Sequence, residues 1–361
     1  MSNTEGGGNT PWGWLGLLKW SLAYQDGTTP SSHSPMSEED KAFLEKVMKE
    51  GIIDENERMK EILQQVTTGL EDIRQQKEEA QVDDDIDMQD LLQELRDIVE
   101  QIDYARAFAA MKGLDFLLGA VAQPEVPRSI QTSCLGVLAT MASNNPPIQK
   151  ELLEMGAIKT LSQVFQSTPA DQFAFRAKII QALSGAVRSD ELSEQVFCGV
   201  DQAKEIIYEG LQQSTAAGNS SAVLQKRTLF FLRALITSDD STRERVRLFG
   251  HSVAYVADQL VTATSEDTTA EIREMGLELL LQILEQKKSV NIVLDRKDNL
   301  VAHGVKRVQT LRALEGDERD YAAVELETWE ALLVQLARAT PDPPEESPLT
   351  IEGATPEVEP Q

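Results

Sequence analysis

A self-similar pattern with a step of about 43 residues constrains the fold of this chain most. Four segments open alike, each with a glycine near its start, at Gly113, Gly156, Gly199 and Gly250. The steps between these glycines are 43, 43 and 51 residues, and the long step contains STAAGNSS, a predicted loop insertion. Each unit is expected to hold a short helix after the glycine, a longer apolar helix and a third helix. A repeat of about 40–47 residues with two or three helices is typical of HEAT and armadillo solenoids.

A second landmark supports this register. Arg128, Arg176 and Arg273 each precede a leucine by seven positions, whereas Arg227 in the third unit precedes its leucine by eight. There is no sustained alternation of apolar and polar residues, so strands are not expected. We therefore predict an all-α, armadillo-type helical-repeat solenoid with about four repeats and capping helices.

The third helix of each unit is expected to line the concave side of the curved stack. Asn145, Ser189 and Ser238 are predicted to cap three of these helices at their N-termini. One unit cannot bury its apolar face alone, so stacking of neighbours makes the core.

Composition divides the chain into four regions. A flexible N-terminal arm carries a short apolar segment, an acidic helical segment or linker follows, and a disordered acidic tail comes after the repeats. The predicted boundaries are 1–36 for the arm with its apolar segment at 12–28, 37–87 for the acidic segment, 88–340 for the armadillo domain and 341–361 for the tail. Within the domain we expect cap helices at 88–108, repeats at about 109–154, 155–197, 198–248 and 249–298, and a C-terminal cap at 299–340.

The charge of the chain disfavours two classes of partner. It carries 60 acidic and 34 basic residues, a formal charge of -26, of which residues 71–103 supply -10 and residues 341–361 supply -6. Such a chain repels phosphate backbones and anionic lipid, so neither nucleic acid nor a membrane surface is expected to be its partner. Its two cysteines, Cys134 and Cys198, make no disulfide framework and favour a cytosolic location. A capped acidic solenoid is compatible with a monomer.

No pattern in the sequence indicates catalysis. The three histidines are scattered, no cysteine or histidine pair has zinc-ligand spacing, and no glycine-rich loop precedes a GK[ST] triplet. We therefore expect no metal, no cofactor and no enzyme activity, and a function in binding a protein. Importin-type stacks are disfavoured, because they hold basic peptides with a ladder of tryptophans, and the repeats between Gly113 and Asn299 contain none.

Several stretches together resemble a known family. They are GLLKWSLAYQDGT from residue 16, MSEEDKAFLEKVM from 36, RMKEI from 58, DLLQELRDIVEQIDYA from 90, GLDFLLGAV from 113, NNP from 144 and AVRSD from 186. Over residues 12–300 the chain is similar to the cytosolic armadillo-repeat nucleotide exchange factors of heat-shock protein 70, the Fes-type and Hsp70-binding-protein group, and nearest to its plant and algal branch.

This resemblance implies a mechanism. The concave stack would grip one lobe of the chaperone's nucleotide-binding domain, open the nucleotide cleft and release ADP, so that ATP enters and the bound client leaves. A generic armadillo adaptor for another protein is the alternative.

The resemblance also gives the arm a role. In the family, a flexible N-terminal arm acts as a release segment, and here the arm is apolar with one positive charge, as a chaperone's peptide-binding domain favours. We expect the arm to act as a pseudo-substrate; the alternative is an amphipathic helix packed back on the stack. The residues concerned are Trp12, Trp14, Leu17, Leu18, Lys19, Trp20 and Leu22.

Contact residues for the partner are expected along the third helices. The candidates are Asn145, Gln149, Arg188, Arg243 and Arg247. Arg188, in AVRSD, matches an arginine of the family at that turn and ranks first. Its alternative interpretation is a cation that satisfies the last carbonyls of the preceding helix.

Overall fold

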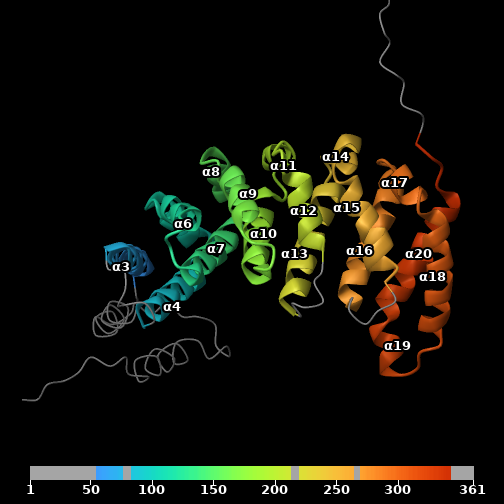
Figure 1. Ribbon diagram of the computed structural model, residues 1–361, viewed down its shortest axis with the longest axis horizontal. Helices are drawn as coiled ribbons and strands as arrows, with labels where there is room; N and C mark the ends of the chain where they lie inside the picture. The colour runs from blue at the N-terminus through green and yellow to red at the C-terminus, as the bar shows by residue number, and fades with distance from the viewer. Residues whose placement is uncertain (1–53, 76–82, 213–218, 264–268, 343–361) are drawn as a thin grey trace, which may run out of the picture.

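The computed structural model describes residues 54–75, 83–212, 219–263 and 269–342, and this part of the chain is helical with no strand. The apolar segment of the arm and the tail after residue 342 lie outside the described residues. The helices stack side by side into an elongated solenoid (Figure 1). The all-α solenoid predicted from the repeats is confirmed.

Each repeat has the three helices that the sequence predicts. The helix after the glycine is followed by a longer helix and then by a short third helix. The first repeat comprises α6 Gly113–Ala122, α7 Arg128–Ala142 and α8 Pro146–Glu154, and the second comprises α9 Ala157–Ser167, α10 Phe173–Val187 and α11 Glu191–Cys198. The third has α12 Ala203–Leu211, α13 Asn219–Thr237 and α14 Arg243–Leu248; the fourth has α15 Gly250–Tyr255 running into the π-helical turn η1 Val256–Val261, then α16 Ala270–Gln286 and α17 Asn291–Leu294.

Further helices close both ends of the stack. At the start, Met59, Ile62 and Val66 of the first described helix are fully buried, because that helix packs on the next two. At the other end Trp329, which is fully buried, joins the last helix to the core. These helices are α3 Glu55–Gln75, α4 Asp83–Ile98 and α5 Ile102–Ala110 at the start, and α18 Lys297–Arg312, α19 Asp317–Tyr321 and α20 Ala323–Arg338 at the end.

The long helices form the spine of the stack. α4, α7, α10, α13, α16 and α20 pack one against the next, whereas the third helices make few contacts with each other. In Figure 1 α7, α10, α13 and α16 stand along one side, with α8, α11, α14 and α17 along the other. The central long helices α7 and α10 bury most of their residues, because they are covered by neighbours on several sides, and only a narrow stripe of each reaches solvent.

The glycines that mark the repeats have different structural roles, as Gly156 and Gly113 illustrate. Gly156 has φ +72, a left-handed conformation that an L-residue rarely adopts, so glycine is required at that turn. At the corresponding turn of the first repeat Lys112 takes the positive φ, and Gly113 instead leaves room for a ring. A Cβ on Gly113 would lie 2.2 Å from a ring carbon of Phe108. Gly113 and Gly156 therefore mark the same turn in their repeats but do not have the same backbone conformation.

Two of the predicted helix caps are wrong by one to four residues. Asp190, and not Ser189, caps α11 by accepting a hydrogen bond from the backbone N–H of Ser193 at 2.9 Å. Thr242, and not Ser238, caps α14 in the same way. Asn145 does precede α8, although its side chain makes no capping hydrogen bond. Ser189 and Ser238 are used elsewhere, in a buried polar network.

No helix in the described ranges has both the length and the apolar character needed to cross a membrane.

Candidate partner-binding groove

The clearest groove in the repeats lies on the long helices. It has a volume of about 450 Å³ and runs across α7, α10, α13 and α16. Its lining combines small residues of α7 and α10 with Phe230 and Met275 and with the cations Arg188, Lys226 and Arg227. No residue of the third helices lines this groove, and the expectation that those helices line the concave side stays a prediction. Successive long helices pack directly on one another, so a continuous surface forms along them.

Arg188 lies at the edge of the groove, and both interpretations of it fit the geometry. It follows the last residue of α10, and its Nε donates to the carbonyl of Ser184 at 3.2 Å. Its guanidinium also lies over the ring of Phe230, 4.6 Å from the ring centroid. Burial lowers the pKa of Arg188, which remains a cation. The side chain is half-buried, and its charge faces the groove.

The other candidate contact residues do not reach this groove. Asn145 and Gln149 are buried, with 2% and 3% of their surfaces exposed, so a partner cannot touch them. Gln149 instead donates to the carbonyls of Gly185 and Arg188, both at 2.8 Å, and so fixes the end of α10. Arg243 and Arg247 are exposed on α14, away from the long helices. Of the five predicted contacts, only Arg188 lines the groove.

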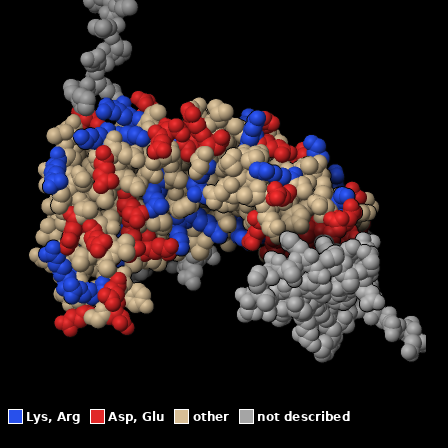
Figure 2. Space-filling view, turned by 180° about the vertical axis from the view of Figure 1, so that it is seen from behind, with Lys and Arg blue, Asp and Glu red and all other residues tan. Residues whose placement is uncertain are grey.

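A row of cations that sequence reasoning missed extends the groove along the spine. Lys178 of α10 lies over Gly136, where an added Cβ would be 3.9 Å from its Nζ and 3.9 Å from the Cδ of Arg96. Burial, and then the charges of Arg227 and Arg96, lower the pKa of Lys178. Arg96 donates to Thr140, and Arg227 donates to the carbonyl of Ala177 at 3.0 Å. Figure 2 shows Lys and Arg side chains gathered near the middle of the face that it presents.

These cations lack the carboxylates that pair with other arginines in the chain. Within the described residues, Arg96, Lys178, Arg188 and Arg227 form no ion pair. Lys226 at the rim, by contrast, pairs with Glu271. Arg188 and Arg227 line the groove, and Arg96 and Lys178 lie beside it. In a chain with a formal charge of -26, a surface with four such cations is suited to an acidic partner.

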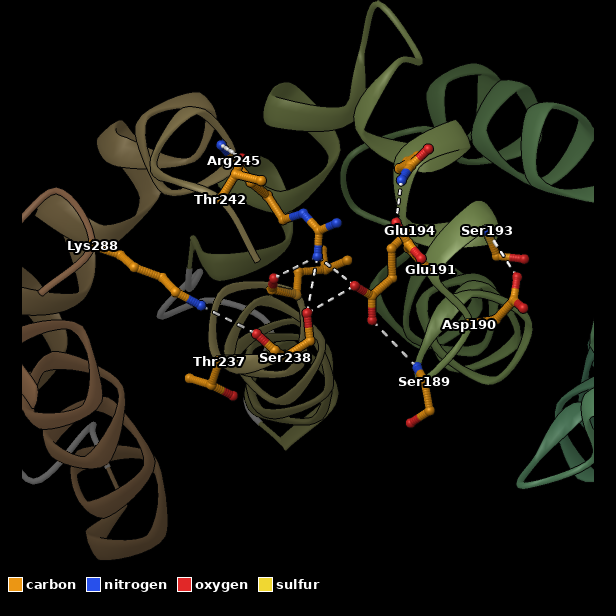
Figure 3. Close-up of polar contacts among 12 residues, drawn as sticks. Ser189, Asp190, Glu191, Ser193, Glu194, Thr237, Ser238, Thr242, Arg245 and Lys288 are labelled. Atoms are coloured by element: carbon orange, nitrogen blue, oxygen red, sulfur yellow. Dashed lines mark hydrogen bonds and ion pairs between the residues drawn. The ribbon is translucent and has the colours of Figure 1, made fainter. Parts of the chain in front are cut away.

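A buried polar network joins the second and third repeats (Figure 3). Glu194 of α11 and Arg245 of α14 form an ion pair whose side chains are only 2% and 6% exposed. Ser238 donates to the same carboxylate at 2.9 Å, and the backbone N–H of Ser189 donates to its other oxygen at 3.3 Å. Arg245 also donates to the carbonyl of Leu235 at 3.2 Å. Both carboxylate oxygens of Glu194 thus accept hydrogen bonds. The network therefore fixes the angle between adjacent repeats.

The landmark arginines have a structural role. Arg176 stacks over Phe165 at 4.3 Å and pairs with Glu209 at 2.8 Å, and Arg128 lies over Phe175 at 4.0 Å. Each links its helix to a neighbouring repeat. Arg227, the member that is out of step in the sequence, enters the groove instead.

The described residues contain no cluster of three or more potential metal ligands. Burial raises the pKa of Cys134 to about 12 and that of Cys198 to about 11, so both thiols remain protonated at neutral pH. The groove therefore offers charge, apolar surface and hydrogen bonds, which are means of binding.

Fold and groove together define an armadillo-type helical-repeat protein. A designed armadillo repeat protein solved in complex with the peptide (KR)4 superposes with a TM-score of 0.52, with 14% identity over 76% of this chain and 99% of the designed one. At that identity the likeness shows the fold alone, and the groove of the present chain is basic.

The comparisons of sequence narrow this class to one family. Residues 15–108 match the family model described as "Nucleotide exchange factor Fes1". Hsp70-binding protein 1 of Macaca fascicularis is 24% identical over 231 residues, which are 63% of this chain and 60% of that protein. The Hsp70 nucleotide exchange factor fes1 of Schizosaccharomyces pombe is 23% identical over 154 residues, 43% of this chain and 50% of that protein. The predicted resemblance is thus confirmed: over these residues the chain is similar to the Fes1 and Hsp70-binding-protein group.

The chain spans about 60% of the length of the first of these relatives. These relatives come from a mammal and a yeast, so the plant and algal branch stays a prediction.

Proposed function

We propose that this protein is a nucleotide exchange factor for Hsp70, a co-chaperone that binds the nucleotide-binding domain and accelerates release of ADP. The match of residues 15–108 to the Fes1 family carries this proposal. The groove on the long helices supports it, because a surface that offers cations, an aromatic ring and small side chains can hold a folded acidic lobe.

The mechanism is thermodynamic linkage between two binding sites. A protein that binds the open, empty chaperone more tightly than the ADP-bound form must weaken ADP binding by the same factor. A tenfold weakening corresponds to a coupling free energy of about 1.4 kcal/mol. The role of this chain is to hold one conformation of its partner, and a rigid stack fixed by buried networks such as that of Glu194 suits this role.

We further propose that the apolar segment of the arm, residues 12–28, occupies the chaperone's peptide-binding site as a pseudo-substrate. The segment lies outside the described residues, and the proposal rests on its sequence and on the family match, which begins at residue 15. Three of the four tryptophans of the chain lie at Trp12, Trp14 and Trp20, beside a single cation, Lys19. Where a protein exposes an apolar patch to solvent, the patch usually marks a contact.

The first experiment is the release of a fluorescent ADP analogue from purified cytosolic Hsp70, with and without this protein. Acceleration at stoichiometric amounts supports the exchange-factor function. No acceleration by a chain whose helical circular dichroism is intact would leave a generic armadillo adaptor, whose partner a pull-down would identify.

The second experiment separates the arm from exchange. A chain lacking residues 1–30 should accelerate ADP release as the full chain does, yet release a labelled client peptide more slowly. Unchanged client release at equal ADP exchange would sink the pseudo-substrate proposal and favour an arm that packs on the stack.

A further inference from the structure

The cations of the groove are held together without a neutralising group among the described residues. Arg96 of α4 and Lys178 of α10 approach each other over Gly136 at the edge of the groove, and Arg227 of α13, which lines the groove, lies close enough for their charges to act on one another. Half-burying like charges side by side costs free energy, because each loses water and repels the others. An anionic segment bound over them would offset this cost.

The groove also has apolar and hydrogen-bonding capacity that the described chain leaves unused. Phe230 is 38% exposed, a large value for an aromatic residue on a long helix, and Met275 lies beside it in the groove. Ser184, which is only 6% exposed, lines the same groove, and its Oγ has no hydrogen-bond partner. A fitting occupant would therefore carry carboxylates, at least one apolar side chain, and an accessible backbone.

The chain itself contains such a segment. Residues 343–361 read PPEESPLTIEGATPEVEPQ, with five glutamates and no basic residue. Near its end, Val358 lies between Glu357 and Glu359, so an apolar side chain is flanked by two carboxylates. Prolines disfavour a helix, so this sequence is compatible with the extended backbone that a groove-bound segment would need.

The segment is long enough to reach the groove. It continues from Asp342, which is held at the C-terminal end of the stack by hydrogen bonds with Asn291 at 3.0 and 3.3 Å. From α20 to α10 there are three helix-to-helix steps of roughly 10 Å each. One helix length, roughly 25 Å, runs at right angles to these steps, so the straight-line distance is about 40 Å. The 19 residues after Asp342 span up to about 60 Å when extended. Tethering also gives the segment an effective concentration of roughly millimolar.

We propose that the acidic tail, residues 343–361, binds in the groove of its own chain, with its glutamates against Lys178, Arg188 and Arg227 and an apolar side chain against Phe230 and Met275. This inference does not depend on the function proposed above. If that function also holds, the tail and the chaperone compete for one surface.

Zero-length carbodiimide cross-linking of the full chain, read by mass spectrometry, tests the proposal. This reagent joins a carboxylate to a lysine amine only where the two are in contact. Lys226 and Glu271 form an ion pair and provide an internal reference. Lys159 on α9, in the same repeat as Lys178, is exposed and off the groove, and so reports random encounters. Mixing chains of two isotopic compositions separates links within a chain from links between chains.

The expected result is links from tail glutamates to Lys178 at a yield at least fivefold above links to Lys159. They should be intrachain, and they should fade between about 0.02 and 1 M salt, because the Debye length shrinks to about 3 Å. Arg227→Glu should lower the Lys178 link at least fivefold, while Lys159→Glu should leave it unchanged. Because Arg227→Glu could disturb the stack, a chain with Glu357→Gln and Glu359→Gln provides a second variant. It leaves the groove intact, changes glutamates far enough along the tail to reach the groove, and should lower the tail links to Lys178.

Three results would overturn the proposal. They are no tail link to Lys178 while the Lys226–Glu271 link forms, equal yields at Lys178 and Lys159, and links only between different chains. The last result would identify a second copy as the occupant.

Discussion

Arg188 combines two roles in one side chain. Its Nε donates to the carbonyl of Ser184, its guanidinium covers Phe230, and its own backbone carbonyl accepts from Gln149. The alternative interpretation as a cation at a helix C-terminus is therefore met by the same geometry that places the charge at the groove.

Charge reversal at this residue tests which role dominates. Arg188→Glu should reduce the acceleration of ADP release by about tenfold or more, about 1.4 kcal/mol of binding, because it opposes an acidic partner. Circular dichroism should show intact helices, and Lys159→Glu should behave as the wild type. A large loss of helicity in Arg188→Glu would favour the structural role.

The buried pair of Glu194 and Arg245 should govern stability rather than binding. Glu194→Ala is expected to lower the free energy of unfolding by about 3–5 kcal/mol, because it leaves the guanidinium of Arg245 buried without a counter-charge. Glu154→Ala, which removes an exposed pair with Lys150, should cost less than about 0.5 kcal/mol. Urea unfolding of both variants measures the difference, and similar values for the two would contradict the network's role.

At the scale of the helix, close approach depends on single glycines. Gly304 of α18 faces Trp329 of α20, and an added Cβ would lie 2.7 Å from two ring carbons. Gly304→Ala should therefore destabilise the C-terminal cap by about 1–3 kcal/mol through overpacking. Gly119→Ala in α6 meets nothing within 4 Å and should stabilise by about 0.5–1 kcal/mol. In thermal unfolding, the Tm of Gly304→Ala should fall and the Tm of Gly119→Ala should rise. A change of Tm in the same direction for both variants would refute the packing argument.

The sequence predicts helices better than it predicts the faces that they present. Glycine landmarks and apolar periodicity are local signals, and the four repeats follow from them in register. Which of three helices lines the groove depends on stacking between repeats, which no local pattern records. The burial of Asn145 and Gln149 follows from that stacking, and their polar side chains suggested exposure.

A usable signal for the groove was nonetheless present in the sequence. Lys178 and Arg227 are cations about one repeat apart, on long helices with extensive buried apolar faces. Such a cation is placed where the helix face leaves the core. The departure of Arg227 from the register of the other landmark arginines coincides with its place in the groove.

For the molecule as a whole, the C-terminal cap introduces a dependence on pH. Glu325 is 2% exposed; burial alone would raise its pKa, but bonds from Arg307 at 2.7 and 2.9 Å and the charge of Arg273 lower it on balance. A carboxyl whose pKa is lower in the folded state contributes stability above its unfolded value, near 4.5, and loses it as the pH falls through the folded pKa.

The consequence is measurable below about pH 4.5. The wild type should lose stability there more steeply than Glu325→Gln, which has no such proton to take up. At pH 7 the variant should be less stable by about 3–5 kcal/mol, because two arginines lose their counter-charge. Urea unfolding at pH 7 and at several acidic values gives both quantities, and parallel pH profiles would contradict the assignment.

The ion pair between α11 and α14 has a mechanical consequence as well. In a solenoid each repeat touches only its neighbours, so a pulling force applied to the two ends loads every junction in series. The junction that Glu194 and Arg245 bridge must break a buried ion pair before water can enter, whereas the pairs Lys226–Glu271 and Arg233–Glu278 at the next junction are already more exposed to water. When the solenoid is stretched in an optical trap, the repeats at its two ends should unfold first. The second and third repeats should unfold last, together in a single step.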